Sequence, residues 1–124
     1  MADEFTYSIN LRLNNLPLRE TYNPGAISVT QAGVGKFSSV VNVGTTEEDV
    51  TLSDITTEGV TVLQNLDATN YVEWGKKDGS GNMQAIGRLK AGEIPAVFGF
   101  APGATLRLKA DTATCDVLIT VYEA

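Results

Sequence analysis

The side chains in this chain that could do chemistry are carboxylates and aromatic rings, because the 124 residues include no histidine. Histidine is the commonest general base and the commonest zinc ligand, so neither a Ser-His-Asp nor a Cys-His arrangement can form. Cys115 is the only cysteine, which excludes an intramolecular disulfide and predicts a small, half-buried strand residue rather than a reactive thiol. The composition therefore argues against a nucleophilic active site and against a zinc site.

Two other kinds of chemistry would use the carboxylates. A glycosidase would need a pair of them about 5 to 10 Å apart across a cleft, but the spacing of Glu73 and Glu93 singles out no such pair. Calcium would be bound by aspartates in loops, and no D-x-[DN]-x-[DN]-G motif is present. Ordinary turn chemistry is the simpler role for the loop aspartates, which are Asp49, Asp54, Asp67, Asp78 and Asp111. We therefore expect no metal, no cofactor and no enzymatic activity.

Phosphate, nucleic-acid and membrane binding find no support in the sequence. The chain lacks a G-x-x-x-x-G-K-[ST] motif, and the Gly-Ser-Gly at 79–81 has the context of a hairpin loop. Fifteen acidic residues against nine Lys and Arg give a net charge of −6, which argues against nucleic acid as a direct partner. No apolar run approaches the length of about 18 residues that a transmembrane helix needs. The acidic start MADEFTYS lacks a signal-peptide pattern, so we expect synthesis in a cytoplasm.

Four aromatic residues in the second half of the chain could form a sugar-binding platform. Phe98 and Phe100 share one face of a predicted strand, whereas Tyr71 and Trp74 fall on opposite faces of another. Packing in the core of a β-sandwich is the simpler role for these rings. Carbohydrate binding through Tyr71 and Trp74 stays an alternative.

The elements that position these residues are short strands. The clearest signal runs from Phe5 to Leu13, where apolar residues alternate with polar ones. Further apolar runs are separated by turns such as Asn23-Pro24-Gly25 and Ala101-Pro102-Gly103, and no segment has helical periodicity over three turns. We predict an all-β chain, forming a single antiparallel β-sandwich or jelly-roll-like barrel of about eight to ten short strands over residues 1–124. Residues 1–4 are expected to be a flexible tail.

Five segments of the C-terminal part follow one another in a recognisable order. The order is a Gly-Val strand start, N-L-D-x-x-N-Y-V, L-K-x-G-E, P-G-x-x-L-x-x-K-A-D and a last strand that ends in an acidic residue. The segments are Gly59-Val60, Asn65 to Val72, Leu89 to Glu93, Pro102 to Asp111 and Val117 to Glu123. In this order they resemble small β-rich virion proteins of tailed bacteriophages. The resemblance covers a little over half of the chain and brings no catalytic residue with it.

This resemblance implies a non-enzymatic structural role in a virion. The expected protein is a capsid decoration (cement) protein that binds the outer capsid surface and stabilises the head, and a neck or tail accessory protein is the alternative within the virion. The expected partners are the major capsid protein or other virion proteins. A homotrimer is expected because many decoration proteins are trimeric, and the expected location is the capsid of a virion assembled in the host cytoplasm.

Five residues are candidates for contact with a partner. Phe5 and Tyr7 belong to the alternating N-terminal segment, which could act as an arm or as an added strand on a neighbour. Trp74 is the only tryptophan, and Lys90 and Glu93 occupy a predicted exposed turn. Neither nucleic acid nor a membrane is expected as a partner.

Overall fold

The computed structural model describes residues 5–15, 17–31, 33–53, 55–91, 96–101 and 103–124, and its contacts separate the chain into two compact units. The first unit is Met1–Ala32, which we call the arm, and the second is Gly33–Ala124, which we call the body. This division falls inside the single domain that the sequence predicts. The elements found in the described residues are twelve β-strands with antiparallel pairing, which confirms the all-β prediction. The count exceeds the predicted one because the arm alone contributes four strands.

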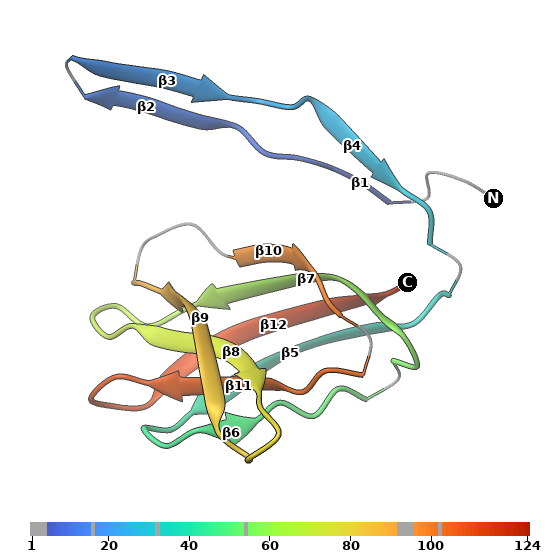
Figure 1. Ribbon diagram of the computed structural model, residues 1–124, viewed down its shortest axis with the longest axis vertical. Helices are drawn as coiled ribbons and strands as arrows, with labels where there is room; N and C mark the ends of the chain where they lie inside the picture. Colours follow the sequence, from blue (N-terminus) through green and yellow to red (C-terminus); the bar gives the residue numbers. More distant parts are fainter. Residues whose placement is uncertain (1–4, 16, 32, 54, 92–95, 102) are drawn as a thin grey trace. The chain divides into compact units, whose positions relative to one another are not determined.

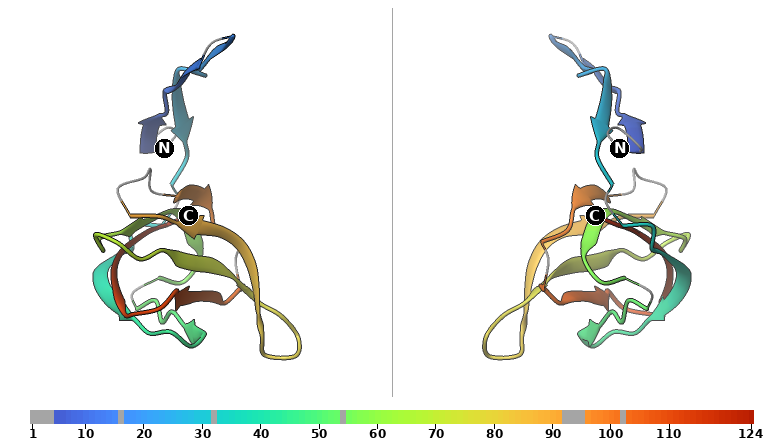
Figure 2. Two further views of the ribbon diagram at one scale, coloured as in Figure 1. Left: turned by 90° about the vertical axis from the view of Figure 1, so that its left-hand side faces the viewer. Right: turned by 90° about the vertical axis from the view of Figure 1, so that its right-hand side faces the viewer.

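The arm is a long antiparallel β-hairpin with one interruption. Its strands are β1 (Phe5–Ser8), β2 (Leu11–Asn15), β3 (Leu18–Tyr22) and β4 (Ala26–Val29). β2 pairs with β3 and β1 pairs with β4 (Figure 1), and Figure 2 shows the resulting two-stranded ribbon from two opposite sides. Between the two ladders, residues 9–10 lie opposite residues 23–25, so the register shifts by one residue as in a β-bulge. Gly25 has a φ of 84° here, and its amide donates to Oδ1 of Asn23 at 3.0 Å, which confirms the predicted turn.

The body contains two four-stranded antiparallel sheets. The eight strands are β5 (Lys36–Val43), β6 (Glu48–Asp49), β7 (Glu58–Asn65), β8 (Val72–Lys77), β9 (Met83–Leu89), β10 (Ala96–Gly99), β11 (Leu106–Ala110) and β12 (Cys115–Glu123). The strand order is β10-β7-β12-β5 in one sheet and β6-β11-β8-β9 in the other (Figure 1). Successive strands change sheet at each connection except between β8 and β9. In the described part of the chain no sheet closes into a barrel, because each keeps two edge strands, so the barrel form of the prediction is not adopted.

Both sheets of the body contribute side chains to one buried core. Along β12 and β11 every second side chain is buried, which is the burial pattern of a strand with one covered face. The members of the core are Val43, Leu63, Val72, Leu89, Phe100, Leu106, Leu108, Ala110, Cys115, Val117, Ile119 and Val121. Cys115 is therefore fully buried rather than half-buried, and this burial raises the pKa of its thiol.

Aspartates close two of the turns that connect the body strands. Oδ2 of Asp67 accepts hydrogen bonds from the amides of Asn70 at 2.7 Å and Thr69 at 3.0 Å. Oδ1 of Asp78 accepts from the amides following it in the β8–β9 loop, at 2.8 and 2.9 Å. These backbone donors lower the pKa of both carboxyl groups, because they stabilise the ionised form. Turn chemistry is thus confirmed for these two residues, whereas Asp54 lies outside the described residues.

Candidate functional site

One face of the arm is apolar and open to solvent. Cross-strand neighbours in an antiparallel pair project to the same side, and β2 and β3 pair Leu11 with Tyr22, Leu13 with Glu20 and Asn15 with Leu18. The exposed fractions are 43% for Leu11, 41% for Leu13, 51% for Leu18 and 60% for Tyr22. We call these four residues, together with Glu20, the leucine face. An apolar patch with a polar rim is typical of an interaction site.

The opposite face of the same two strands is polar. It pairs Arg12 with Thr21 and Asn14 with Arg19. Within the described residues neither arginine forms an ion pair, and neither does Glu20 on the leucine face. The outer part of the arm therefore has two chemically distinct sides, one of leucine and tyrosine and one carrying two positive charges.

Covering the leucine face would stabilise the arm. Burying a leucine completely is worth about 1.5–3 kcal/mol, so covering the exposed half of each of the three leucines would contribute about 1 kcal/mol per residue. A two-stranded hairpin is only marginally stable in water unless a further layer covers it. A surface that covered this face would therefore stabilise the arm substantially.

The predicted contact residues Phe5 and Tyr7 lie together on the other ladder of the arm. β1 and β4 pair Phe5 with Val29 and Tyr7 with Ile27 on one face, and these four side chains are half-buried. The two rings are tilted, with their centroids 6.0 Å apart. In the structure this segment pairs with β3 and β4 of the same chain, and its contact with a neighbour stays a prediction.

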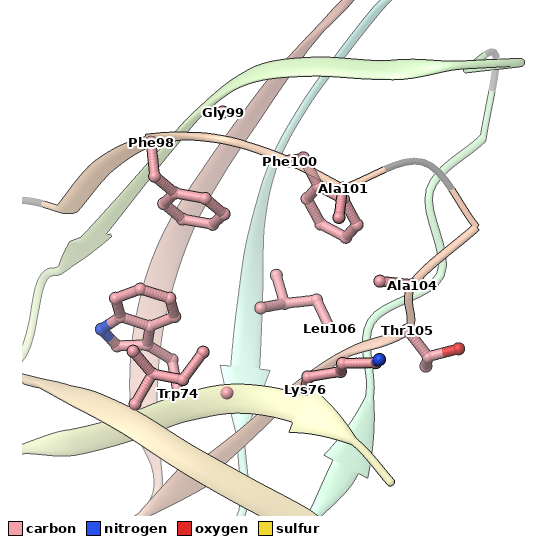
Figure 3. Close-up of a pocket in the computed structure, with 11 residues that line it drawn as sticks. Trp74, Lys76, Phe98, Gly99, Phe100, Ala101, Ala104, Thr105 and Leu106 are labelled. Atoms are coloured by element: carbon pink, nitrogen blue, oxygen red, sulfur yellow. The ribbon is translucent and has the colours of Figure 1, made fainter. Parts of the chain in front are cut away.

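A second candidate surface is an apolar pocket in the body, drawn in Figure 3. Its volume is about 230 Å³, and its apolar lining includes Trp74, Ile86, Phe98, Phe100, Ala104 and Leu106. The indole of Trp74, from β8, stacks on the ring of Phe98, from β10, with centroids 4.9 Å apart and planes 13° from parallel. Phe98 lies in turn 6.1 Å from Phe100. Among the described residues that line the pocket, Lys76 is the only charged one.

Two irregularities in the β8–β9 pair orient Trp74 toward this pocket. Trp74 pairs directly with Gly87, where an added Cβ would lie 2.9 Å from the indole Nε1, so only glycine leaves room for the ring. The register then shifts between Trp74 and Gly75, which leaves Ile86 as the extra residue of a β-bulge. Ile86 is 69% exposed and lines the mouth of the pocket. An isolated glycine in a predicted strand, such as Gly87, is the sequence signal that could have revealed this close approach.

The aromatic residues do not form one sugar-binding platform. One face of the Trp74 ring is occupied by Phe98, and both pack against the core, in agreement with the simpler prediction. Tyr71 instead lies against the guanidinium of Arg88, whose Cζ is 4.3 Å from the ring centroid. Desolvation and a hydrogen bond with Asp111 raise the pKa of the Tyr71 hydroxyl. Tyr71 and Trp74 are thus engaged separately.

Arg107 is the centre of a polar cluster that connects elements of the body. The Arg107 guanidinium bonds to Oδ1 of Asp49 at 2.6 Å, to Oε2 of Glu47 at 3.3 Å and to the Gly81 carbonyl at 2.8 Å. It thereby connects β6, β11 and the β8–β9 loop. The hydrogen bond from Arg107 holds the pKa of Asp49 below its usual value. Because both carboxylates bond to the Arg107 guanidinium, they are poorly placed to act as an acid–base pair.

The remaining predicted positions are Glu73, Lys90 and Glu93, of which the structure describes the first two. Glu73 lies across from Arg88 on β9 and Lys109 on β11, so it belongs to a charged outer face of the sheet. Lys90 is exposed at the end of β9, whereas Glu93 lies outside the described residues. Within those residues no group of three His, Cys, Asp or Glu side chains could hold a metal ion, and no helix is long and apolar enough to cross a membrane.

Comparison of the chain with protein-family models, with curated proteins and with solved structures finds no significant match. The surfaces of the arm and the body are therefore the starting point for any functional assignment.

Proposed function

We propose that the chain is a non-enzymatic structural protein of a tailed-bacteriophage virion, a capsid decoration (cement) protein that binds the outer capsid surface and stabilises the head. The observation that carries this proposal is the leucine face of the arm, an apolar surface that the arm itself leaves uncovered. A protein that works by covering a surface needs such a face and needs no reacting group. The order of the C-terminal segments, which resembles small virion proteins, agrees with this role.

We further propose that the body is a jelly roll, the finer form of its two-sheet architecture. In an eight-stranded jelly roll two Greek keys place the first strand beside the last and the second beside the seventh. The body pairs β5 with β12 and β6 with β11, and it places β7 between β12 and β10 and β8 between β11 and β9. Jelly rolls are common in viral capsid proteins and in lectins, so this order supports a virion role without separating it from sugar binding.

The proposed partners are the major capsid protein or another virion protein, together with further copies of the chain in a homotrimer. The proposed location is the outer surface of the capsid. Three-fold self-association suits a protein that occupies a junction between capsomers, because each copy then meets an equivalent part of the shell.

Binding to particles tests the role directly. Particles from a phage whose gene for this chain has been deleted are mixed with purified protein and sedimented through a sucrose cushion. We expect saturable binding and a higher temperature of genome release for decorated particles. Leu13→Ser should weaken binding, whereas Thr21→Ser, on the polar face of the arm, should leave binding unchanged. Absence of the chain from wild-type particles in mass spectrometry, together with no binding to deleted ones, would refute the proposal.

A carbohydrate-binding protein is the second candidate, because the pocket beside Trp74 is open, apolar and lined by aromatic rings. A glycan array compares wild type with Trp74→Ala, after thermal melting has shown that the variant is folded. Binding that is lost in the variant supports this alternative. No binding by wild type, or equal binding by both proteins, excludes Trp74 as a sugar platform.

A further inference from the structure

We propose that the free edge of β10, together with the apolar pocket beside it, binds an extended segment of a partner protein as an added strand. One large apolar side chain of that segment would fill the pocket, and an acidic one would lie against Lys76. The capsid contact proposed above uses the arm, whereas this surface belongs to the body. The two proposals therefore stand or fall separately.

The backbone of β10 has unpaired groups along one side. β10 pairs with β7 and with no other described strand. The amide of Phe100, which continues this ladder, donates to the carbonyl of Gly59 at 2.9 Å. Because residues along an antiparallel strand alternately face the partner and face away from it, Val97 and Gly99 direct their N–H and C=O groups to the free edge. No described residue bonds to these groups, so an added strand would satisfy them.

This edge lacks the features that usually prevent strand addition, which include charge, proline, a bulge and very short length. Elsewhere in the body, β6 has only two residues, both acidic, and β9 carries the bulge at Ile86. The residues of β10, Ala96–Gly99, include neither a charge nor a proline, and Val97 is 38% exposed. β5 is an open edge as well, but the described residues that line the pocket include Phe98 and Gly99 of β10 and none of β5.

The pocket lies where a side chain of an added strand would enter. Cross-strand neighbours project to the same side of a sheet, and Phe98 projects inward to stack on Trp74 (Figure 3). A residue placed opposite Phe98 would therefore project into the pocket, whereas its neighbours opposite Val97 and Gly99 would face solvent. The pocket volume of about 230 Å³ is below the range of about 300–1,000 Å³ that is typical of sites for drug-sized ligands. This size suits one or two apolar side chains.

Lys76 gives the pocket a preference for a negative charge. Among the described residues it has no ion-pair partner. Figure 3 shows Lys76 below Phe100, and Trp74 below Phe98. In an antiparallel added strand, the residue opposite Phe100 comes two positions before the residue opposite Phe98, so the segment should read acidic-x-apolar. The net negative charge of the chain does not prevent this contact, because exposed charges more than about 10 Å away are largely screened at about 0.1 M salt.

The lining of the pocket favours a peptide over a sugar. Sugar hydroxyls need hydrogen-bonding partners, and among the described lining residues only Lys76, Thr105 and Trp74 have polar side-chain atoms. A strand, in contrast, makes its hydrogen bonds with the backbone of β10 and needs only apolar contact inside the pocket.

Selection from a yeast-displayed library of random short peptides tests the inference on the full chain. We expect enrichment of the acidic-x-apolar pattern. Val97→Pro should weaken binding of a selected synthetic peptide about fivefold or more, because it removes an outward N–H and leaves the β7 ladder intact. Val40→Pro makes the corresponding change on β5, the other edge of this sheet, and should leave binding unchanged. Val97→Thr, which keeps the amide, should bind like wild type.

A second variant tests the pocket without altering the backbone. Selection against Lys76→Glu should enrich a basic residue in place of the acidic one. If Val97→Pro does not fold, as judged by thermal melting, the Lys76→Glu selection decides.

Three outcomes would overturn the inference. They are the absence of any enriched peptide, a selected peptide that binds folded Val97→Pro as tightly as wild type, and an unchanged charge preference against Lys76→Glu. A glycan that binds through Trp74 while no peptide does would be the first of these outcomes and would assign the pocket to sugars.

Discussion

Asn65 is the side chain whose loss should destabilise the body most clearly. It lies at the end of β7 with only 9% of its surface exposed. Its amide nitrogen donates to the carbonyls of Asn70 and Leu89, each at 2.8 Å, and its Oδ1 accepts from the amide of Asp67 at 2.9 Å. One side chain therefore joins the end of β7, the turn before β8 and the end of β9, strands that belong to different sheets.

The magnitude follows from these three bonds. A hydrogen bond contributes about 0.5–1.5 kcal/mol net, and leaving a buried group without a partner costs about 1–3 kcal/mol. Asn65→Ala removes all three bonds at a site that water enters poorly, so we expect the free energy of unfolding to fall by about 3–4 kcal/mol. For a domain of this size, about 1 kcal/mol corresponds to a shift in Tm of about 4–8 °C, which predicts a loss of at least about 12 °C.

Urea denaturation followed by tryptophan fluorescence measures this loss, because Trp74 is the only tryptophan and lies in the body. The matched control is Asn42→Ala, which removes one exposed hydrogen bond to Asp116 and should cost less than about 1 kcal/mol. Asn65→Asp keeps the accepting oxygens but loses both donated bonds, so at neutral pH it should destabilise the body at least as much as Asn65→Ala. An Asn65→Ala variant as stable as Asn42→Ala would refute the reasoning.

Three further predictions concern single groups of the body. Amides of residues 35 and 56 donate to the Glu123 carboxylate and lower its pKa below the ordinary value of about 4.5, so its stabilising contribution is present above that pH and is lost as the pH falls through the lower, folded pKa. Urea midpoints in this acid range should therefore change less with pH for Glu123→Gln than for wild type, and identical slopes for the two proteins would contradict this prediction. Gly87→Ala should displace the Trp74 indole, shift its fluorescence and lower the free energy of unfolding by about 1–2 kcal/mol. Gly79→Ala, with no atom near the added Cβ, should change neither the fluorescence nor the free energy of unfolding. Cys115 should react with a thiol reagent only as fast as the body unfolds, because it is buried and its pKa is raised, so rapid native labelling would disprove its place in the core.

The local features of the fold could be predicted from the sequence because they depend on neighbouring residues. Alternation and turn residues identify the strands, and Asp67 and Asp78 bond the backbone of their own turns. Sheet order is different, because β12 pairs with β5 and β7, which lie far away in the sequence. Any two strands with one apolar face satisfy the same pattern, so periodicity alone cannot choose among partners.

The candidate surfaces were only partly predictable for the same reason. Contact of Phe5 and Tyr7 with a partner stays a prediction, and the structure adds a larger open patch formed by Leu11, Leu13 and Leu18, which belong to paired strands of the arm. Contact of Trp74 with a partner also stays a prediction; its stack on Phe98 joins two sheets and has no signature in local spacing.

The contrast between the two units explains why function is best sought on the arm. In β12 the alternating apolar residues are fully buried, because a second sheet covers that face. In β2 and β3 four of the six side chains on one face are leucine or tyrosine, yet every side chain of these two strands is exposed, since two strands have no second layer of their own. Apolar side chains in such a regular pattern would be costly if they remained in water. The pattern is consistent with a missing layer, and a layer supplied by another molecule would make the stability of the arm depend on assembly.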